Sequence, residues 1–230
     1  GILNRTLYFF MFFVHSVSIP IHANILLDSG KHYFKNLIDA PPFNKGNVTD
    51  FAQDRQGFIW IATTGTGVYK FNGIDFTPYK FDFKDSNSLS NNLTQCAFVD
   101  SKNRLWFGTE DGLNLYDRNL DHFNKVVLNK GSNVKENVFA IEEDNLGNLL
   151  IGTARKGLYK LNINTFKVDK ILNNTTTDIS INSIKHTKQG KTFVGTNLGL
   201  KEVDFVHNKL IHTRLFTDNQ KTINKAIEVS

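Results

Sequence analysis

One sequence pattern recurs four times along the chain, and it constrains the fold more than any other feature of the sequence. The copies are GFIWIATTGTGVYKF (57–71), NRLWFGTEDGLNLY (103–116), GNLLIGTARKGLYKL (147–161) and GKTFVGTNLGLKEV (190–203). Measured at the residue before the Gly-Thr or Ala-Thr pair, the copies are spaced by 46, 44 and 43 residues, at Ile61, Phe107, Ile151 and Val194. This period fits one four-stranded propeller blade, and it also fits two-helix repeats.

The residue types inside each copy favour strands over helices. A short apolar stretch ends at Asp54, Asp100, Asp144 or Thr187, and three residues later stands Gly57, Asn103, Gly147 or Gly190. Glycine and asparagine tolerate a left-handed backbone, so this position predicts a tight turn between antiparallel strands. The run that follows, such as 58–61, is rich in β-branched and aromatic residues and too short for a helix. Both alternating faces of this run are apolar, which predicts that neighbouring sheets cover it on both sides.

The rest of each copy predicts a third and a fourth strand. A second glycine, at Gly67, Gly112, Gly157 or Gly199, precedes a third strand. A fourth strand is expected at Asp75–Tyr79, Asp121–Val126, Phe166–Ile171 and Leu210–Phe216. Each copy is therefore a four-stranded antiparallel meander, which excludes helical repeats. The predicted fold class is all-β, a partial β-propeller of four-stranded blades near 47–80, 93–127, 137–172 and 181–217, with a fifth blade beginning at 222.

The repeated frame resembles a known family. It reads N-V-x-x-I-x-x-D-x-x-G-x-[LI]-W-[IF]-G-T-x-x-G-[LV]-x-x-[YF], with SLSNN (88–92) before the second copy, and it is similar to the two-component regulator propeller repeat. The resemblance runs from Tyr33 to the C-terminus. The fourth copy departs from it with Thr187 and Phe193, and the third with Leu150. The resemblance implies a propeller in the periplasmic sensor of a bacterial hybrid two-component system, as in gut Bacteroidetes.

The two ends of the chain predict an exported protein that continues beyond this sequence. After Arg5, an apolar stretch runs to Ala23 in the order of a signal peptide; a membrane anchor is the alternative, but the interruptions by polar residues and Pro20 favour the signal peptide. We expect a cleaved signal peptide at 1–23 and the partial propeller at 24–230. The segment His32–Ile38 is expected to form the outer strand of the last blade of the complete ring, which would remove two free sheet edges.

The amino-acid composition limits the kinds of partner and site that can be expected in this region. Cys96 is the single cysteine, so no internal disulfide can form, and its place in a strand predicts a small buried apolar residue. The net charge of +5 comes from 27 basic and 22 acidic residues, and the lysines are scattered and form no stripe. Nucleic acid is therefore not expected as a partner. The seven histidines have no metal-ligand spacing, and there is no G-x-S-x-G elbow. We expect no metal, no cofactor and no catalytic site in this region.

Two sets of repeated residues could suggest a site but have simpler explanations. Asp54, Asp100 and Asp144 could form a ring of carboxylates, yet their shared position before a turn favours hydrogen bonds from the backbone N–H groups of that turn. Trp60 and Trp106 could stack on a sugar. The other two copies place Leu150 and Phe193 at that position, so apolar bulk in the core is the favoured interpretation.

Three functions from different classes remain. By resemblance, the chain is a periplasmic, ligand-sensing propeller that binds an oligosaccharide or related small molecule and signals to a cytoplasmic histidine kinase. The resemblance also implies a homodimer in the full-length protein, anchored in the inner membrane through segments beyond this chain. The alternatives are an exported propeller enzyme of the lyase or dehydrogenase type and a secreted protein-binding scaffold.

Connectivity predicts the binding face. In a four-stranded meander, the loop between the second and third strands and the connector to the next blade emerge on the same side. These loops differ between copies whereas the strands do not, as recognition loops do. The predicted ligand contacts are Glu110, Asp111, Arg155 and Lys156, and the last two suit an anionic sugar. Since apolar blade faces remain uncovered at both ends of the row, the chain by itself is expected to associate or to be poorly soluble.

Overall fold

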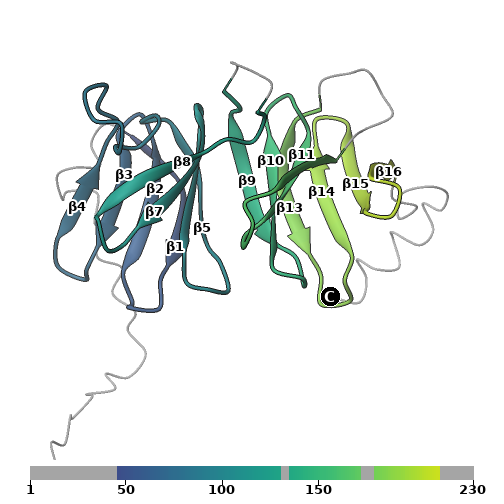
Figure 1. The fold of residues 1–230 in the computed structure, drawn as a ribbon. Helices are drawn as coiled ribbons and strands as arrows, with labels where there is room; N and C mark the ends of the chain where they lie inside the picture. The colour runs from purple at the N-terminus through teal and green to yellow at the C-terminus, as the bar shows by residue number, and fades with distance from the viewer. Residues whose placement is uncertain (1–45, 131–134, 172–178, 213–230) are drawn as a thin grey trace, which may run out of the picture. The chain divides into compact units, whose positions relative to one another are not determined.

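The chain folds into successive four-stranded antiparallel sheets, each made of strands that are consecutive in sequence (Figure 1). The structure, a computed structural model, describes residues 46–130, 135–171 and 179–212. The first two sheets contain β1 (Asn47–Gln53), β2 (Ile59–Thr64), β3 (Gly67–Phe71), β4 (Phe76–Tyr79), β5 (Thr94–Val99), β6 (Leu105–Thr109), β7 (Gly112–Asp117) and β8 (His122–Val126). The next two contain β9 (Val138–Glu143), β10 (Asn148–Thr153), β11 (Leu158–Asn162), β12 (Val168–Ile171), β13 (Ile181–His186), β14 (Thr192–Thr196), β15 (Gly199–Asp204) and β16 (Lys209–His212).

This arrangement confirms the predicted all-β partial propeller. The predicted turn glycines and Asn103 all have a left-handed backbone, with φ of 62° at Asn103 and 89° at Gly57. Three of the four fourth strands begin later than the sequence pattern predicts, and the last begins one residue earlier, at Lys209. Asp121 and Phe166 were expected to start strands, but both have positive φ, 52° and 55°, and belong to the preceding turn. The described part of the last fourth strand ends at His212.

The sheets stack because each second strand sends alternate side chains to opposite neighbours. Trp60 packs toward the second sheet, in one cluster with Leu105 and Phe107. Trp106, between those two residues in β6, faces the other way and packs with Leu149 and other residues of the third sheet. A third cluster joins the third and fourth sheets. The two-faced apolar pattern therefore arises from sheet stacking, and Trp60 and Trp106, both fully buried, are core residues as predicted.

The repeated aspartate holds the turn between the first and second strands. Asp54 Oδ1 accepts hydrogen bonds from the backbone N–H groups of Gln56 and Phe58, each at 3.0 Å. Asp54 Oδ2 accepts one from Trp60 Nε1 at 2.9 Å. Asp100 accepts the equivalent bonds, including one from Trp106 Nε1. In the third copy, where leucine replaces tryptophan, the Nδ2 of Asn148 contacts the carboxylate of Asp144 instead. The turn-binding interpretation of these carboxylates is thereby confirmed.

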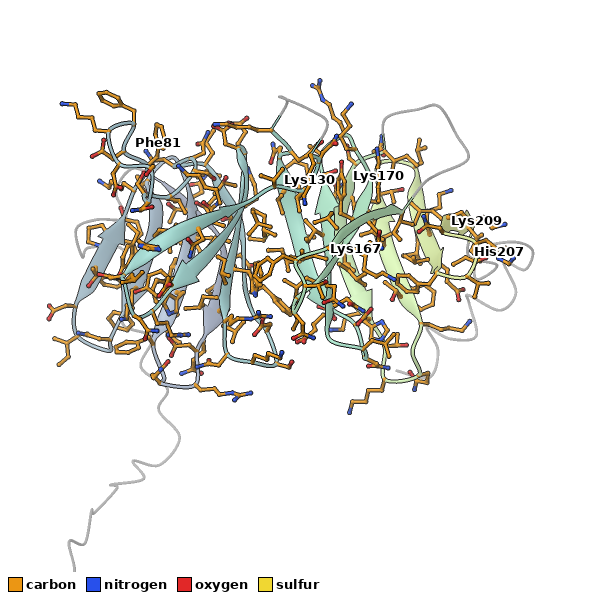
Figure 2. All side chains as sticks on the ribbon, in the orientation of Figure 1. Phe81, Lys130, Lys167, Lys170, His207 and Lys209 are labelled. Atoms are coloured by element: carbon orange, nitrogen blue, oxygen red, sulfur yellow. The ribbon has the colours of Figure 1, made fainter. Side chains whose placement is uncertain are left out.

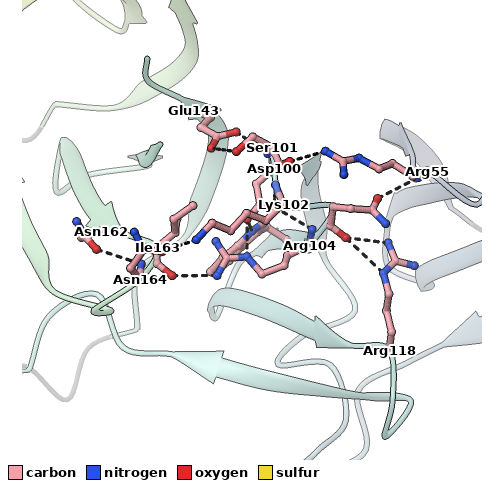
Figure 3. A network of polar contacts seen from close by, with 12 residues as sticks. Arg55, Asp100, Ser101, Lys102, Arg104, Arg118, Glu143, Asn162, Ile163 and Asn164 are labelled. Carbon is pink, nitrogen blue, oxygen red and sulfur yellow. Dashed lines mark hydrogen bonds and ion pairs between the residues drawn. The ribbon is translucent and has the colours of Figure 1, made fainter. Parts of the chain in front are cut away.

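A polar network joins neighbouring sheets at the same turns (Figure 3). Ser101, in the second sheet, donates from its N–H and its hydroxyl to the carboxylate of Glu143, at 2.7 and 2.6 Å. Arg118 Nη1 reaches back to Asp54 Oδ2 at 2.8 Å, and both side chains lie mostly or wholly out of solvent. Arg104 binds Asp100 at 2.7 Å and donates to a carbonyl of the third sheet. Polar and charged contacts therefore add to the apolar packing between the first and second sheets and between the second and third.

The glycine of the Gly-Thr pair allows the sheets to approach closely. A Cβ at Gly152 would lie 2.6 Å from Cγ2 and 3.0 Å from the carbonyl oxygen of Ile181, in the next sheet. A Cβ at Gly108 would lie 2.8 Å from the carbonyl oxygen of Val138. Only a hydrogen atom fits at these contacts. At these two positions, glycine is thus a requirement of sheet stacking.

Several predictions concern residues outside the described ranges. These are the signal peptide at 1–23, the outer strand at His32–Ile38 and the fifth blade from 222. Within the described ranges, no helix has the length and hydrophobicity needed to cross a membrane. Figure 2 labels basic side chains on the fourth strands β12 and β16 and on the turns that precede them. Two of the labelled residues pair with aspartates, Lys167 with Asp169 at 3.2 Å and His207 with Asp204 at 2.7 Å.

Candidate functional site

The loops between second and third strands lie against the connectors between sheets, as connectivity predicts. The N–H groups of Gly65 and Gly67 both donate to the carbonyl of Asn92, at 3.0 Å. Glu110 N–H donates to the carbonyl of Leu93 at 2.9 Å, and Gly157 N–H to that of Ile179 at 3.0 Å. We call the surface formed by these loops and connectors the connector face.

A threonine at the end of each second strand fixes the loops of the connector face. Its hydroxyl donates to the carbonyl of the glycine that starts or precedes the third strand. The distances are 2.7 Å for Thr63, 3.1 Å for Thr109, 2.9 Å for Thr153 and 2.6 Å for Thr196. The hydroxyls of the last three also accept a backbone N–H from their own loop. In the sequence, this role appears as a Gly-Thr or Ala-Thr pair whose threonine is followed by a glycine three or four residues later, and the pattern by itself indicates only a repeat.

The connector between the first two sheets is fixed equally well. Ser90 Oγ lies 2.7 Å from Thr109 Oγ1, and Asn114 Nδ2 donates to Ser90 Oγ at 2.8 Å. Asn92 Oδ1 accepts the N–H of Phe81 at 2.8 Å. Ser90, Thr109 and Asn114 are all buried. The SLSNN segment therefore forms the connector itself, and these hydrogen bonds hold it against the first two sheets.

The four predicted ligand contacts all lie on the connector face, on the loops of two successive sheets. Glu110, Arg155 and Lys156 are exposed, and their side chains have no bonding partner within the described residues. Asp111 is half-buried, and its Oδ2 pairs with Lys135 Nζ at 3.0 Å. The structure thus joins Asp111 to the next connector and does not join it to Arg155 or Lys156.

A recess of about 220 Å³ opens beside this ion pair. It is lined by Ser90, Asp111, Gly112, Leu113, Lys125, Val126, Val127, Leu128, Asn129, Lys135 and Glu136. Its volume is below the roughly 300–1,000 Å³ of sites that enclose a whole drug-sized ligand. The recess can therefore hold only part of a ligand, such as one substituent of a larger molecule.

Glu136 is the buried charged group of this recess. Its side chain accepts a hydrogen bond from the Tyr159 hydroxyl at 3.2 Å. Burial, together with the negative charge of Glu136, raises the pKa of Tyr159. The phenol therefore stays protonated and remains a donor to the carboxylate. Sequence reasoning missed Glu136, because nothing in its local pattern distinguishes it from a solvated loop residue.

The structure offers little support for other chemistry in the described residues. No group of three His, Cys, Asp or Glu side chains within them is arranged to hold a metal ion. Cys96 is buried, as predicted, and burial raises the pKa of its thiol to about 12. At neutral pH the thiol is therefore protonated and a poor nucleophile.

With this geometry established, comparison with known proteins identifies the repeats. The sequence model of the family described as two component regulator propeller matches residues 42–65 and 88–111. The chain carries two-component regulator propeller repeats. The first matched segment contains β1 and β2 of the first sheet. The second contains the connector between the first two sheets, followed by β5 and β6 of the second sheet.

A curated relative and several solved structures are similar to the chain in sequence or in fold. The chain is 28% identical over 165 residues to "Histidine kinase P4" of Formosa agariphila. The aligned region covers 69% of this chain and 12% of the relative. Two extracellular domains of hybrid two-component systems from Bacteroides thetaiotaomicron are 21% and 24% identical, with TM-scores of 0.60 and 0.63. They cover 74% and 73% of this chain, and 21% and 24% of their own chains. Virginiamycin B lyase from Staphylococcus aureus shares the fold at 12% identity, with a TM-score of 0.56 over 75% of this chain and 57% of its own.

Proposed function

We propose that the chain is part of the ligand-sensing propeller of a hybrid two-component signalling protein. It recognises a carbohydrate or related small molecule and passes the signal to a histidine kinase in the cytoplasm. The observation that carries this proposal is the presence of two-component regulator propeller repeats in a chain that resembles a histidine kinase over 165 residues. The chain spans about an eighth of that kinase, 12% of its length, so the kinase region belongs to other parts of the protein.

The proposed location is the periplasm. The signal-like segment at 1–23 supports export, and the similar Bacteroides structures are extracellular domains. In the full-length protein we expect an anchor in the inner membrane, because a periplasmic signal has to cross that membrane to reach a cytoplasmic kinase, and a homodimer, which the resemblance to the family implies. The chain itself contacts neither the membrane nor nucleic acid in this proposal.

We propose that this region binds without catalysing a reaction. The likeness to virginiamycin B lyase, at 12% identity, extends to the fold alone. In the described residues, the repeated carboxylates are bound by turn N–H groups, and the cysteine is buried and protonated. These groups have structural roles, so none of them supports a lyase or dehydrogenase function.

On the connector face, we propose that Glu110, Asp111, Arg155 and Lys156 contact the ligand. The threonine hydrogen bonds fix their loops, and three of the four side chains extend into solvent. Asp111 is already paired with Lys135, so its replacement should weaken binding less than that of Arg155 or Lys156. Replacing all four with alanine in the full-length protein should lower affinity for an acidic oligosaccharide, measured by calorimetry. An unchanged affinity would remove these residues from the site.

Autophosphorylation tests the proposed function itself. The full-length protein is reconstituted in lipid nanodiscs and incubated with ATP and, in turn, with malto-, xylo-, manno- and laminari-oligosaccharides and oligogalacturonate. We expect one of these to bind and to change the rate of autophosphorylation several-fold. A protein that autophosphorylates at the same rate with every member of the panel would contradict carbohydrate sensing, and one that never autophosphorylates would contradict the kinase assignment.

A further inference from the structure

All four sheets interrupt their first strand at the same place. In each pairing of first and second strands the register shifts by one residue near the start of the first strand. Such a β-bulge leaves one residue without a partner and turns its side chain away from the regular pleat. The bulged residues are Thr49, Gln95, Phe139 and Asn182.

These four residues come together in space. They line one recess of about 550 Å³, together with their neighbours Asp50, Cys96, Ala140, Ile141, Ser183 and Ile184. All four first strands contribute to it. The volume lies within the range of small-molecule sites, and β-bulges are frequent beside such sites. The bulges lie where the connectors enter the first strands, so the recess opens at the end of the sheets that carries the connector face.

The frame around the bulges is rigid. Thr49 Oγ1 donates to the carbonyl of Thr94 at 2.8 Å, and Ala97 N–H donates to Asp50 Oδ2 at 3.0 Å, so β1 is fixed to β5 on both sides of the bulge. The residues just before the later bulges, Thr94, Val138 and Ile181, are fully buried. A ligand would therefore meet an already ordered wall, which lowers the entropic cost of binding.

The bulged residues differ in a way that the fold does not require. Some positions with a structural role keep one residue type in all four copies, as the threonines that bind the glycine carbonyls do. The bulge instead holds a hydroxyl, an amide, an aromatic ring and a second amide. Within the described part of the chain, the side-chain amides of Gln95 and Asn182 have no hydrogen-bond partner. Each amide can both donate and accept.

We propose that this recess binds a neutral, hydroxyl-rich molecule of the sugar class. The amides of Gln95 and Asn182 would exchange hydrogen bonds with hydroxyl groups, and the half-buried ring of Phe139 offers a flat apolar face to the C–H side of a sugar ring. Asp50 is the one charged lining residue, and its carboxylate already accepts two backbone N–H groups. Since no cationic group lines the recess, an acidic sugar is disfavoured there. The inference rests on the proposed function and names a site and a ligand class for it.

Two variants test the recess in the full-length protein. Gln95→Ala/Asn182→Ala removes the amides, and Phe139→Leu removes the ring while keeping apolar bulk. Binding of the five oligosaccharide preparations above is measured by calorimetry. The double variant should weaken binding of a neutral oligosaccharide by about tenfold or more, because two hydrogen bonds are lost. Phe139→Leu should weaken it several-fold. The control, Gln56→Ala/Asn119→Ala, replaces exposed amides outside the recess and should leave affinity unchanged, with equal thermal stability confirming the fold of all three.

The outcomes separate this inference from the proposed function. A neutral oligosaccharide that binds both folded variants as tightly as the wild type would overturn the recess as its site and leave carbohydrate sensing intact. Binding of oligogalacturonate alone would overturn the ligand class and direct attention to the loops of Arg155 and Lys156. If no member of the panel binds the wild type, both the inference and carbohydrate sensing are contradicted.

Discussion

At the residue scale, the repeated aspartate shows how far single positions can be interpreted. Its place before a turn predicted hydrogen bonds from the turn backbone, and Asp54, Asp100 and Asp144 all accept them. The sequence did not predict the bond from the tryptophan indole or the ion pair from Arg118, which lies 64 positions away. Such contacts depend on how two sheets meet, and local sequence carries no signal for that.

Replacing Asp54 should destabilise the chain strongly. Asp54→Ala leaves Arg118, the Trp60 indole and two turn N–H groups without their acceptor in a buried place. Removing one partner of a buried ion pair costs about 3–5 kcal/mol, so we expect a loss of about 3 kcal/mol in the free energy of unfolding. Urea unfolding at fixed protein concentration measures it. Asp75→Ala, at an exposed position, is the control, and equal losses in the two variants would contradict the assigned role.

Acid should weaken the contact between the first two sheets. Hydrogen bonds from Tyr116 and Tyr79, at 2.5 and 2.8 Å, hold the pKa of Asp121 below its ordinary value of 3.8. A carboxylate with a lowered pKa contributes stability that is complete above pH 3.8 and is lost as the pH falls through its lowered pKa. The urea midpoint of Asp121→Asn should therefore fall less steeply than that of the wild type below about pH 4. Parallel pH profiles would show that Asp121 does not contribute.

At the element scale, the sequence predicted the strands better than their irregularities. Period-two alternation and the glycine positions located all four meanders, because these features act within a few residues. The strands β8 and β12 start later than predicted because Asp121 and Phe166 have left-handed backbones that their residue types do not predict. The bulges escaped prediction for a different reason. A bulge is a mismatch between two paired strands, so it appears only when both are placed.

Sheet-to-sheet approach gives a prediction at this scale. Gly152→Ala places a methyl group against Ile181, including its backbone carbonyl, which cannot move without shifting β13. Overpacking of this kind costs about 1–3 kcal/mol, and we expect a loss of that size in thermal or urea unfolding. The reverse change, Ala62→Gly at the equivalent position of the first copy, is the matched control and should cost under about 1 kcal/mol. Wild-type stability in Gly152→Ala would argue against close stacking.

At the scale of the whole molecule, the burial of the residue in the middle of each second strand depends on whether another sheet covers it. Trp60, Trp106 and Leu150 each face the following sheet and are fully buried. Phe193 occupies the same position in the fourth copy and is only partly buried among the described residues. The sequence indicated this equivalence through its period. It could not indicate the ligand recess, because the recess needs one residue from each of four sheets, and those residues share no type.

This exposed face should make the chain associate. On the outer side of the fourth sheet, Phe193 is partly buried, and Leu200 and Ile211 are 37% and 36% exposed, with Glu202 paired between Phe193 and Ile211. Exposed apolar side chains on an uncovered sheet face favour self-association, so sedimentation velocity of the chain by itself should show species that grow with concentration. Phe193→Asn/Leu200→Asn should shift the distribution toward monomer, because it makes the face polar. Leu146→Asn changes an apolar residue that is 86% exposed in a turn, and it should have no such effect. A compact monomer at every concentration, with a cooperative melt, would mean that the sheets satisfy their faces within one chain.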